Sequence, residues 1–379
     1  MENIPKLNYY QQKGASEIKR KKLGFFMPFK KSLTILFLFL SVFASSIQNL
    51  FSQAPTSENE QRIKAYLEKF PKSDADDNGI LTLQELLTHM RKTRKGREKS
   101  NNDDPFKPSS DNTNIRYSDK HKRNVLDYYP AKKKNSLAPV FVWFHGGGFS
   151  GGDKDNIRNN GAKMLKEYLD QGYAVFSCNY PFIDQKSDVL RNGMLDEYVE
   201  NNFLSKQTPK QQESRNEYLK IMAHCGRAVQ FIRSKSKEWN LDSQKICVGG
   251  ASAGALISQW LAYSDDLAKS NSDDPVEKYS SKAQVSVGLA QPVGTDSLVM
   301  RYMEEGEAPL FIYTNAPEKD VIHHPINALR IRDKAKELKI PCVAVGGGRN
   351  KLPVPKDGNS WLNMQIEFCA KHLKLSSNK

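Results

Sequence analysis

The sequence predicts an α/β domain preceded by a small helix-loop-helix segment. Short apolar runs with the composition of buried strands alternate with stretches of helical pattern along the carboxyl-terminal part of the chain. A serine flanked by glycines stands between one such strand and the helix that follows it. An acidic loop of fixed spacing lies between two helical stretches near the amino terminus, and it predicts the helix-loop-helix segment.

The serine is Ser252, within the sequence GGASAG at residues 249–254. The apolar run 245–248 precedes it as a strand, and the run 255–261 follows it with a helical pattern. G-x-S-x-G between a strand and a helix is the pattern of a nucleophile elbow, whose strained turn exposes the serine hydroxyl. The flanking glycines leave room for that turn. The alternative is an ordinary glycine-rich turn between strand and helix.

A second glycine-rich motif, HGGGF at residues 145–149, follows the predicted strand 139–144. A loop of this kind supplies backbone N–H groups to an oxyanion hole, together with the N–H of the residue after the nucleophile. The candidate donors are therefore Gly146, Gly147 and Ala253.

The same loop also matches G-x-G-x-x-G, the pattern of a dinucleotide site, through Gly146, Gly148 and Gly151. The next predicted strand, residues 173–178, ends in Asn-Tyr-Pro and not in the acidic residue that binds the ribose. We therefore favour the oxyanion interpretation.

With these motifs in this order, the chain resembles the α/β-hydrolase superfamily, in its carboxylesterase and hormone-sensitive-lipase-like branch, over residues 115–375. The matching stretches are HGGGFSGGDK at 145–154, AVFSCNYPF at 174–182 and the segment 228–254. The resemblance implies a three-layer sandwich, with a mostly parallel sheet and helices on both faces. It also implies a serine nucleophile, an acid and a histidine in that chain order, and no organic cofactor.

The acid is expected after the predicted strand 309–315, where Asp320 is the first candidate and Glu318 the second. The alternative is that both are solvated loop carboxylates. The family usually places its histidine after the next strand, here 341–345, but this chain has Arg349 there. His372 lies in a predicted terminal helix and fits a surface role better.

His323 and His324 are then the candidates for the general base, in a loop that must bend back toward the acid. Pro325 favours an extended conformation at the residue before it. The alternatives for this pair are helix entry, a structural role or metal ligation. If neither histidine serves, Ser252 has no base to activate it.

The amino-terminal loop, residues 74–85, fits the EF-hand pattern D-x-[DN]-x-[DN]-G-x₅-E at every constrained position. Oxygen ligands of this spacing predict Ca²⁺ binding, with helical stretches at 62–70 and 83–91 on either side. A single hand is expected to be a structural or weak extracellular site. The predicted ligands are Asp74, Asp76, Asn78, the carbonyl of Ile80, Thr82 and Glu85.

The first 54 residues have a basic stretch, a short apolar core at 33–44 and a small-residue site at 52–54, which predict a cleaved signal peptide. The product is then secreted or periplasmic; an uncleaved leader would instead anchor it to the membrane. The predicted organisation is a signal peptide at 1–54, a calcium-binding EF-hand at 55–95, a polar linker at 96–114 and the hydrolase-like domain at 115–379. Residues 183–214 form a polar insertion, either a lid or a surface excursion.

Composition agrees with this organisation. The formal net charge is +14, but no nucleic-acid motif accompanies it, so we expect no nucleic-acid partner. The chain has five cysteines; Cys178, Cys247 and Cys342 fall in apolar strands, which predicts buried free thiols.

The sequence therefore predicts an exported carboxylic-ester hydrolase, acting on a small ester or an esterified polysaccharide, with an appended calcium-binding hand. The alternative is a catalytically degenerate hydrolase fold that serves as a calcium-dependent binding module, because Arg349 occupies the usual histidine position.

Overall fold

The computed structural model describes residues 61–82, 85–86, 89, 104–132, 136–183, 209–355 and 360–375. The predicted signal peptide, the linker up to residue 103 and most of the insertion at 183–214 lie outside these residues. The chain divides into two units, with the boundary between Asp103 and Asp104. Among the described residues, no helix combines the length and apolar character needed to cross a bilayer.

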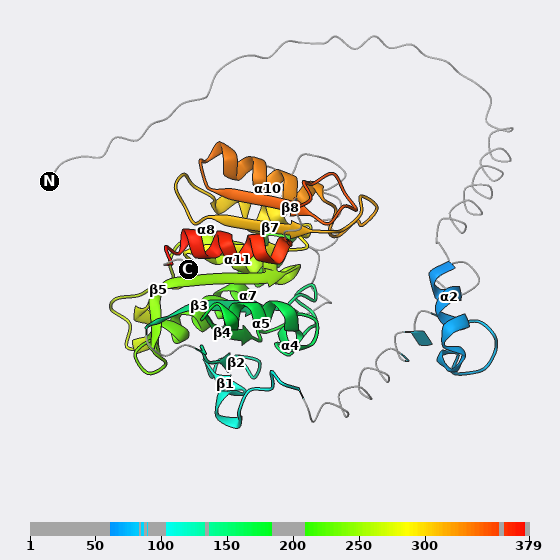
Figure 1. Cartoon of the computed structure of the whole chain (residues 1–379), viewed down its shortest axis with the longest axis horizontal. Helices are drawn as coiled ribbons and strands as arrows, with labels where there is room; N and C mark the ends of the chain where they lie inside the picture. Colours follow the sequence, from blue (N-terminus) through cyan, green and yellow to red (C-terminus); the bar gives the residue numbers. More distant parts are fainter. Residues whose placement is uncertain are drawn as a thin grey trace, which may run out of the picture. The chain divides into compact units, whose positions relative to one another are not determined.

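The second unit is built around an eight-stranded sheet with the order β1-β2-β4-β3-β5-β6-β7-β8 (Figure 1). β1 and β2 pair antiparallel, β2 pairs antiparallel with β4, and the remaining neighbours are parallel. The strands are β1 Ile115–Arg116, β2 Val125–Tyr129, β3 Ala138–Phe144, β4 Ala174–Cys178, β5 Leu241–Ala251, β6 Val285–Leu289, β7 Leu310–Thr314 and β8 Cys342–Gly346.

Helices cover both faces of the sheet, as the predicted three-layer arrangement requires (Figure 1). One apolar core packs beneath α7, α8 and α10, and a second packs beneath α5 and α11. The α-helices of this unit are α4 Asn156–Asn159, α5 Ala162–Asp170, α7 Pro209–Ser234, α8 Ala253–Tyr263, α9 Thr295–Leu298, α10 Ile326–Glu337 and α11 Trp361–His372; the 3₁₀ helices are η2 Ser110–Asn112, η4 Pro275–Lys278 and η5 Met300–Tyr302.

β3 shows how a strand serves both cores. Successive side chains of a strand point to opposite faces, so Val140 and Val142 enter one core while Phe141 and Trp143 enter the other. All four are buried. This two-sided burial explains why the parallel strands read as continuous apolar runs in the sequence.

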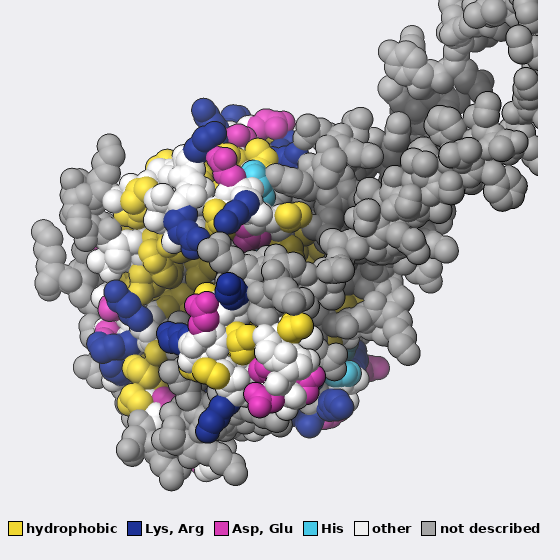
Figure 2. Space-filling view, turned by 90° about the vertical axis from the view of Figure 1, so that its right-hand side faces the viewer, with side chains coloured by type: hydrophobic (Ala, Val, Ile, Leu, Met, Phe, Trp, Pro, Cys, Tyr) yellow, Lys and Arg dark blue, Asp and Glu magenta, His cyan; other side chains and the backbone are white. Residues whose placement is uncertain are grey.

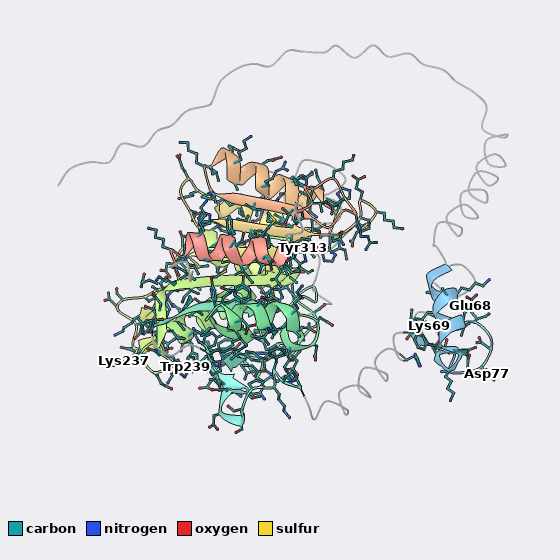
Figure 3. The ribbon with its side chains drawn as sticks, in the orientation of Figure 1. Glu68, Lys69, Asp77, Lys237, Trp239 and Tyr313 are labelled. Carbon is teal, nitrogen blue, oxygen red and sulfur yellow. The ribbon has the colours of Figure 1, made fainter. Side chains whose placement is uncertain are left out.

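Aromatic side chains pack at the end of the core where β5 begins. Trp239, which is labelled in Figure 3, stacks against Tyr128 with ring centroids 4.9 Å apart and against Phe176 at 5.4 Å. This aromatic cluster lies at the start of β5, at the other end of the strand from Ser252.

Several predicted boundaries differ from the observed ones. The strand before the serine runs from Leu241 to Ala251, so Gly249 and Gly250 belong to the strand and not to the turn. The residues expected as the insertion up to 214 include the first residues of α7, which begins at Pro209. All five cysteines are free, and four are buried while Cys342 is partly exposed.

The first unit contains α2 Gln61–Lys69, the 3₁₀ turn η1 Pro71–Ser73 and the acidic loop. Ile63 and Leu81 are its buried apolar side chains, 4% and 0% exposed.

A buried ion pair links β2 to the loop that follows β3. Lys154 Nζ lies 3.1 Å from Asp127 Oδ2, and both side chains are almost completely buried. Burial raises the pKa of Asp127 above its usual value. The hydrogen bond from the Asn114 N–H and the charge of the Lys154 ammonium lower this pKa, but burial has the larger effect. The pair thereby fixes the antiparallel edge of the sheet to the glycine-rich loop.

Removing one partner of this pair should be costly, because the other is left charged and buried. We expect Lys154→Met to lower the free energy of unfolding by about 3–5 kcal/mol at pH 7. The double variant Asp127→Leu/Lys154→Met should recover most of that loss. Urea unfolding of both proteins measures the difference; equal destabilisation in the two would contradict the ion-pair account.

Candidate active site

Ser252 lies in the tight turn between β5 and α8. Its backbone has φ 54° and ψ −117°, a conformation that is unfavourable for a residue with a side chain. A Cβ atom on Gly250 would lie 2.2 Å from the Gly254 carbonyl oxygen, and one on Gly254 would lie 2.0 Å from that of Phe144. The glycines flanking the serine are thus required by close backbone contacts, and the turn presents the hydroxyl at the end of the strand.

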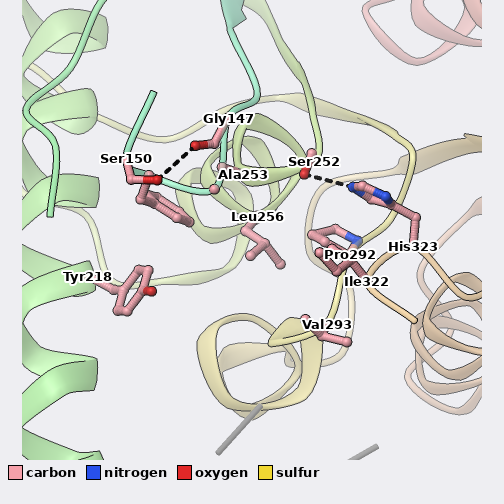
Figure 4. A pocket seen from close by; sticks show the side chains of 12 residues that line it. Gly147, Ser150, Tyr218, Ser252, Ala253, Leu256, Pro292, Val293, Ile322 and His323 are labelled. Atoms are coloured by element: carbon pink, nitrogen blue, oxygen red, sulfur yellow. Dashed lines mark hydrogen bonds between the residues drawn. The ribbon is translucent and has the colours of Figure 1, made fainter. Parts of the chain in front are cut away.

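His323 is the histidine that the structure brings to this serine. Its Nε2 lies 2.9 Å from Ser252 Oγ (Figure 4). Its Nδ1 lies 3.5 Å from Asp320 Oδ1. A hydroxyl that donates to Nε2 leaves the ring proton on Nδ1, directed toward the carboxylate. The order serine, imidazole, carboxylate is the arrangement that activates a serine nucleophile.

His324 is directed elsewhere. Its Nδ1 accepts a hydrogen bond of 3.1 Å from the backbone N–H of Ile326, at the start of α10. Of the two adjacent candidates, one therefore faces the serine and the other caps a helix.

Asp320 is held by the loop that carries the imidazole. Its Oδ1 accepts hydrogen bonds from the backbone N–H groups of His323, at 2.9 Å, and Ile322, at 3.1 Å. Burial alone raises the pKa of Asp320, but these bonds and the neighbouring imidazole outweigh it and lower the pKa below its usual value. Glu318, the second candidate acid, lies 3.5 Å from Lys351 at the surface instead.

The loop after β8, where the resemblance implies a histidine, has a different role. Arg349 is exposed to solvent. Its neighbour Asn350 donates from Nδ2 to the carbonyl oxygens of Thr314, at 3.0 Å, and Ala316, at 2.9 Å. This loop braces the start of the segment that carries Asp320 and His323.

The three predicted oxyanion donors surround the serine. Ala253 is the first residue of α8, where an N–H group has no acceptor within the helix. The N–H groups of Gly146 and Gly147 have no acceptor in the parts of the chain that the structure describes. A Cβ on Gly146 would lie 3.3 Å from Ser252 Cβ, which shows how close this loop comes to the serine.

Hydrogen bonds from Tyr180 and Arg123 hold the HGGG loop in place. The hydroxyl of Tyr180 donates to the carbonyl of His145 at 2.7 Å, and Arg123 Nη2 donates to that of Gly152 at 3.1 Å. His145 Nδ1 lies 2.7 Å from the carbonyl oxygen of Gly146 and therefore carries the ring proton. Burial lowers the pKa of His145 to about 4, so the ring is neutral at pH 7.

A cavity of about 400 Å³ opens beside Ser252 Oγ and His323. Figure 2 shows hydrophobic side chains gathered on the face of the molecule toward which the parallel strands run. In Figure 4, Tyr218 lies across the cavity from Ser252. Apart from Ser252, His323 and Ser150, the described lining is glycine backbone and apolar or aromatic side chains: Gly147, Gly148, Phe149, Tyr218, Ala253, Leu256, Pro292, Val293 and Ile322.

The acidic loop brings three of the predicted calcium ligands together. Carboxylate oxygens of Asp74, Asp76 and Glu85 lie within 4.8 Å of one another. Asp74 Oδ1 is buried and has no hydrogen-bond partner among the described residues, as expected of an oxygen that binds a cation. Gly79 has φ 81°, which allows the sharp turn of the loop. The residues therefore fit a Ca²⁺ ion.

The other predicted ligands lie in the same loop. Asn78 Oδ1 accepts from the N–H of Ile80 at 2.8 Å, and the Thr82 hydroxyl donates to Glu85 Oε2 at 2.7 Å. The Ile80 carbonyl belongs to the same turn.

Comparison with known proteins gives matches to an esterase family and to solved esterases. A family model described as BD-FAE matches residues 126–188 and 184–309, together just under half of the chain. A truncated carbohydrate esterase from gut microbiota has a TM-score of 0.50 and 14% identity, covering 70% of this chain and 99% of its own. The chain has an α/β-hydrolase fold.

Two further solved structures are similar to this α/β-hydrolase chain at lower TM-scores. Propionate-bound esterase 2 from the planctomycete Thermogutta terrifontis has a TM-score of 0.47 and 16% identity, over 69% of this chain and 94% of its own. An acetyl ester-xyloside bifunctional hydrolase from Caldicellulosiruptor lactoaceticus has a TM-score of 0.43 and 17% identity, over 66% and 85%. The search of curated proteins finds no match.

The neutral, buried His145 predicts a pH dependence of stability. Its pKa falls from 6.5 to about 4 on folding, so between these values the unfolded chain binds a proton that the folded chain does not. The free energy of unfolding should therefore rise with pH across this window, by on the order of 3 kcal/mol from this group. His145→Gln should remove that component from urea-unfolding curves recorded from pH 4 to 7; curves parallel to those of the wild type would contradict it.

Proposed function

We propose that this chain is an exported carboxylic-ester hydrolase with Ser252 as nucleophile, His323 as general base and Asp320 as the acid that orients it. The observation that carries the proposal is the 2.9 Å contact between Ser252 Oγ and His323 Nε2, with the Asp320 carboxylate on the other side of the ring. It supports catalysis over the alternative of a degenerate binding module, which assumed that Ser252 lacks a base.

The first half of the reaction forms an acyl-enzyme. Ser252 Oγ attacks the ester carbonyl carbon while His323 Nε2 takes the hydroxyl proton, and Asp320 stabilises the imidazolium that results. His323 then gives this proton to the leaving alkoxide, so an alcohol departs and the acyl group stays on Ser252. Water then attacks the acyl carbon while His323 Nε2 takes one of its protons. His323 returns that proton to Ser252 Oγ as the acyl–oxygen bond breaks, and the carboxylic acid is released.

Negative charge develops on the carbonyl oxygen at each tetrahedral step. The N–H of Ala253 and those of Gly146 and Gly147 are fixed by the elbow and by the braced loop before the substrate arrives. Donors that need no reorganisation contribute most to stabilising such an oxyanion; removal of one typically costs about a hundredfold to a thousandfold in kcat.

The cavity favours an uncharged ester. Among the described residues its lining is mainly apolar and includes no Asp, Glu, Lys or Arg side chain, which favours an apolar acyl or alcohol group. Because one neighbour of the same fold is described as a carbohydrate esterase, we include esters on sugars or polysaccharides among the substrates.

We also propose that the acidic loop binds Ca²⁺ through Asp74, Asp76 and Glu85, with Asn78, the Ile80 carbonyl and Thr82 completing the oxygen set. The clustered carboxylates and the unpartnered Asp74 Oδ1 support this assignment. Export remains a proposal from the leader sequence, and it agrees with a calcium site because free Ca²⁺ is far more abundant outside cells.

The adjacent histidines provide a matched test of the catalytic assignment. His323→Ala and Ser252→Ala should each lower kcat for p-nitrophenyl acetate or butyrate by at least about a thousandfold, because the nucleophile is lost or left without its base. His324→Ala should keep most of the wild-type turnover, because the Nδ1 of that ring accepts the Ile326 N–H at the start of α10 and the ring does not line the cavity. Equal rates for wild type and Ser252→Ala would refute the ester-hydrolase proposal.

The calcium site can be tested with a control from the same loop. Glu85→Gln removes the carboxylate expected to bind bidentately and should weaken Ca²⁺ binding by at least about tenfold in isothermal titration calorimetry. Asp77 is exposed at a non-ligand position and is labelled in Figure 3, so Asp77→Asn should bind almost as well as the wild type. Equal affinities of the two variants would contradict the ligand assignment.

A further inference from the structure

A completely buried amide pair lies behind the cavity and has no role in the chemistry described above. Gln259 Nε2 donates to Gln291 Oε1 at 2.6 Å, and Gln291 Nε2 donates back to Gln259 Oε1 at 2.8 Å. Both side chains are 0% exposed. Buried amides are costly unless they are satisfied, so a reciprocal pair of this kind fixes the separation of the two elements that carry it.

The two elements are the helix that begins at the nucleophile and the loop that follows β6. Gln259 lies on α8, which starts directly after Ser252, and Gln291 lies just beyond the end of β6. A Cβ on Gly288 would lie 2.6 Å from Gln259 Nε2, so the glycine leaves the space in which the pair forms.

Hydrogen bonds continue from Gln291 through this loop. Gln291 Nε2 also donates to Thr295 Oγ1 at 2.7 Å, and that hydroxyl donates to the Pro292 carbonyl at 2.7 Å. The next residue, Val293, donates its backbone N–H to the carbonyl of Ile322 at 2.8 Å. Ile322 directly precedes His323.

These contacts link the base to the nucleophile through the protein interior. His323 is on a loop between β7 and α10. Asp320 holds the backbone of this loop at His323, but that hydrogen bond stays within the loop and does not connect it to α8. The contacts from Gln259 on α8 to Gln291, and from Val293 to Ile322, connect the loop of His323 to the helix that begins after Ser252. They therefore fix the position of His323 relative to Ser252. A displacement of about 1 Å at such a site can cost a hundredfold in rate.

We propose that Gln291, paired with Gln259, is a positioning residue that holds His323 in hydrogen-bonding register with Ser252. This inference rests on the proposed ester hydrolysis. Gln291 does not touch the reacting atoms; it acts through Val293 and Ile322.

The test replaces both amides with methionine. A single Gln291→Met leaves the Gln259 amide buried without its partner and should destabilise the fold, whereas Gln259→Met/Gln291→Met removes both polar groups and keeps similar volume. The double variant should unfold close to the wild-type Tm. Its kcat for p-nitrophenyl butyrate should fall by about tenfold to a hundredfold, with KM changed less than about threefold.

The matched control is Gln365→Met, which removes another glutamine that is 0% exposed, in α11 on the opposite face of the sheet. It should leave kcat unchanged. If the double variant does not fold, Thr295→Val removes one hydroxyl of the same connection with little change in shape and should also lower kcat. A folded double variant with wild-type kcat would overturn the proposal.

A crystal structure of the double variant separates this proposal from the proposed function. We expect the bond between Val293 N and Ile322 O to be lost and the Ser252–His323 contact to lengthen. If both distances remain as in the wild type, the positioning role is wrong, whether or not the wild-type protein hydrolyses esters. If wild type and Ser252→Ala turn over equally, the proposed function is wrong, and the distances alone decide the positioning role.

Discussion

The close backbone packing around the turn at Ser252 is the constraint on which the rest of this structure depends. Between β5 and α8, the chain reverses so tightly that only hydrogen fits at Gly250 and Gly254. This packing holds Ser252 at φ 54°, with its hydroxyl facing His323 Nε2. The oxyanion donors, the cavity and the imidazole are all placed relative to that one oxygen atom.

The proposed acid and the proposed base lie on one loop in this chain. Asp320 accepts the backbone N–H of His323, so the residue that orients the imidazole also shapes the turn that presents it. The loop is supported from both sides, by Val293 after β6 and by Asn350 after β8. The position at which the sequence resemblance implied a histidine thus carries a structural brace, Asn350, and Arg349 beside it is exposed to solvent.

Local sequence signals predicted the elements that depend on local backbone chemistry. The elbow, the HGGG loop and the parallel strands follow from glycine spacing and apolar runs, and the structure has the strands and helix there. The choice between His323 and His324 depends on a long-range contact to Val293 and on where α10 begins, which no local pattern contains. The sequence pattern did not predict β1 and β2 either. Asp127 in β2 has the charge of a solvent-facing residue, and its burial depends on the distant partner Lys154.

The central claim, that Ser252 is a nucleophile activated by His323, is tested most directly by covalent labelling. A fluorophosphonate probe reacts with an activated serine hydroxyl and is located by mass spectrometry of the digested protein. The account predicts one adduct, on the peptide that contains Ser252, in the wild type and almost none in His323→Ala. Labelling at another residue, or equal labelling of Ser252 with and without His323, would contradict it.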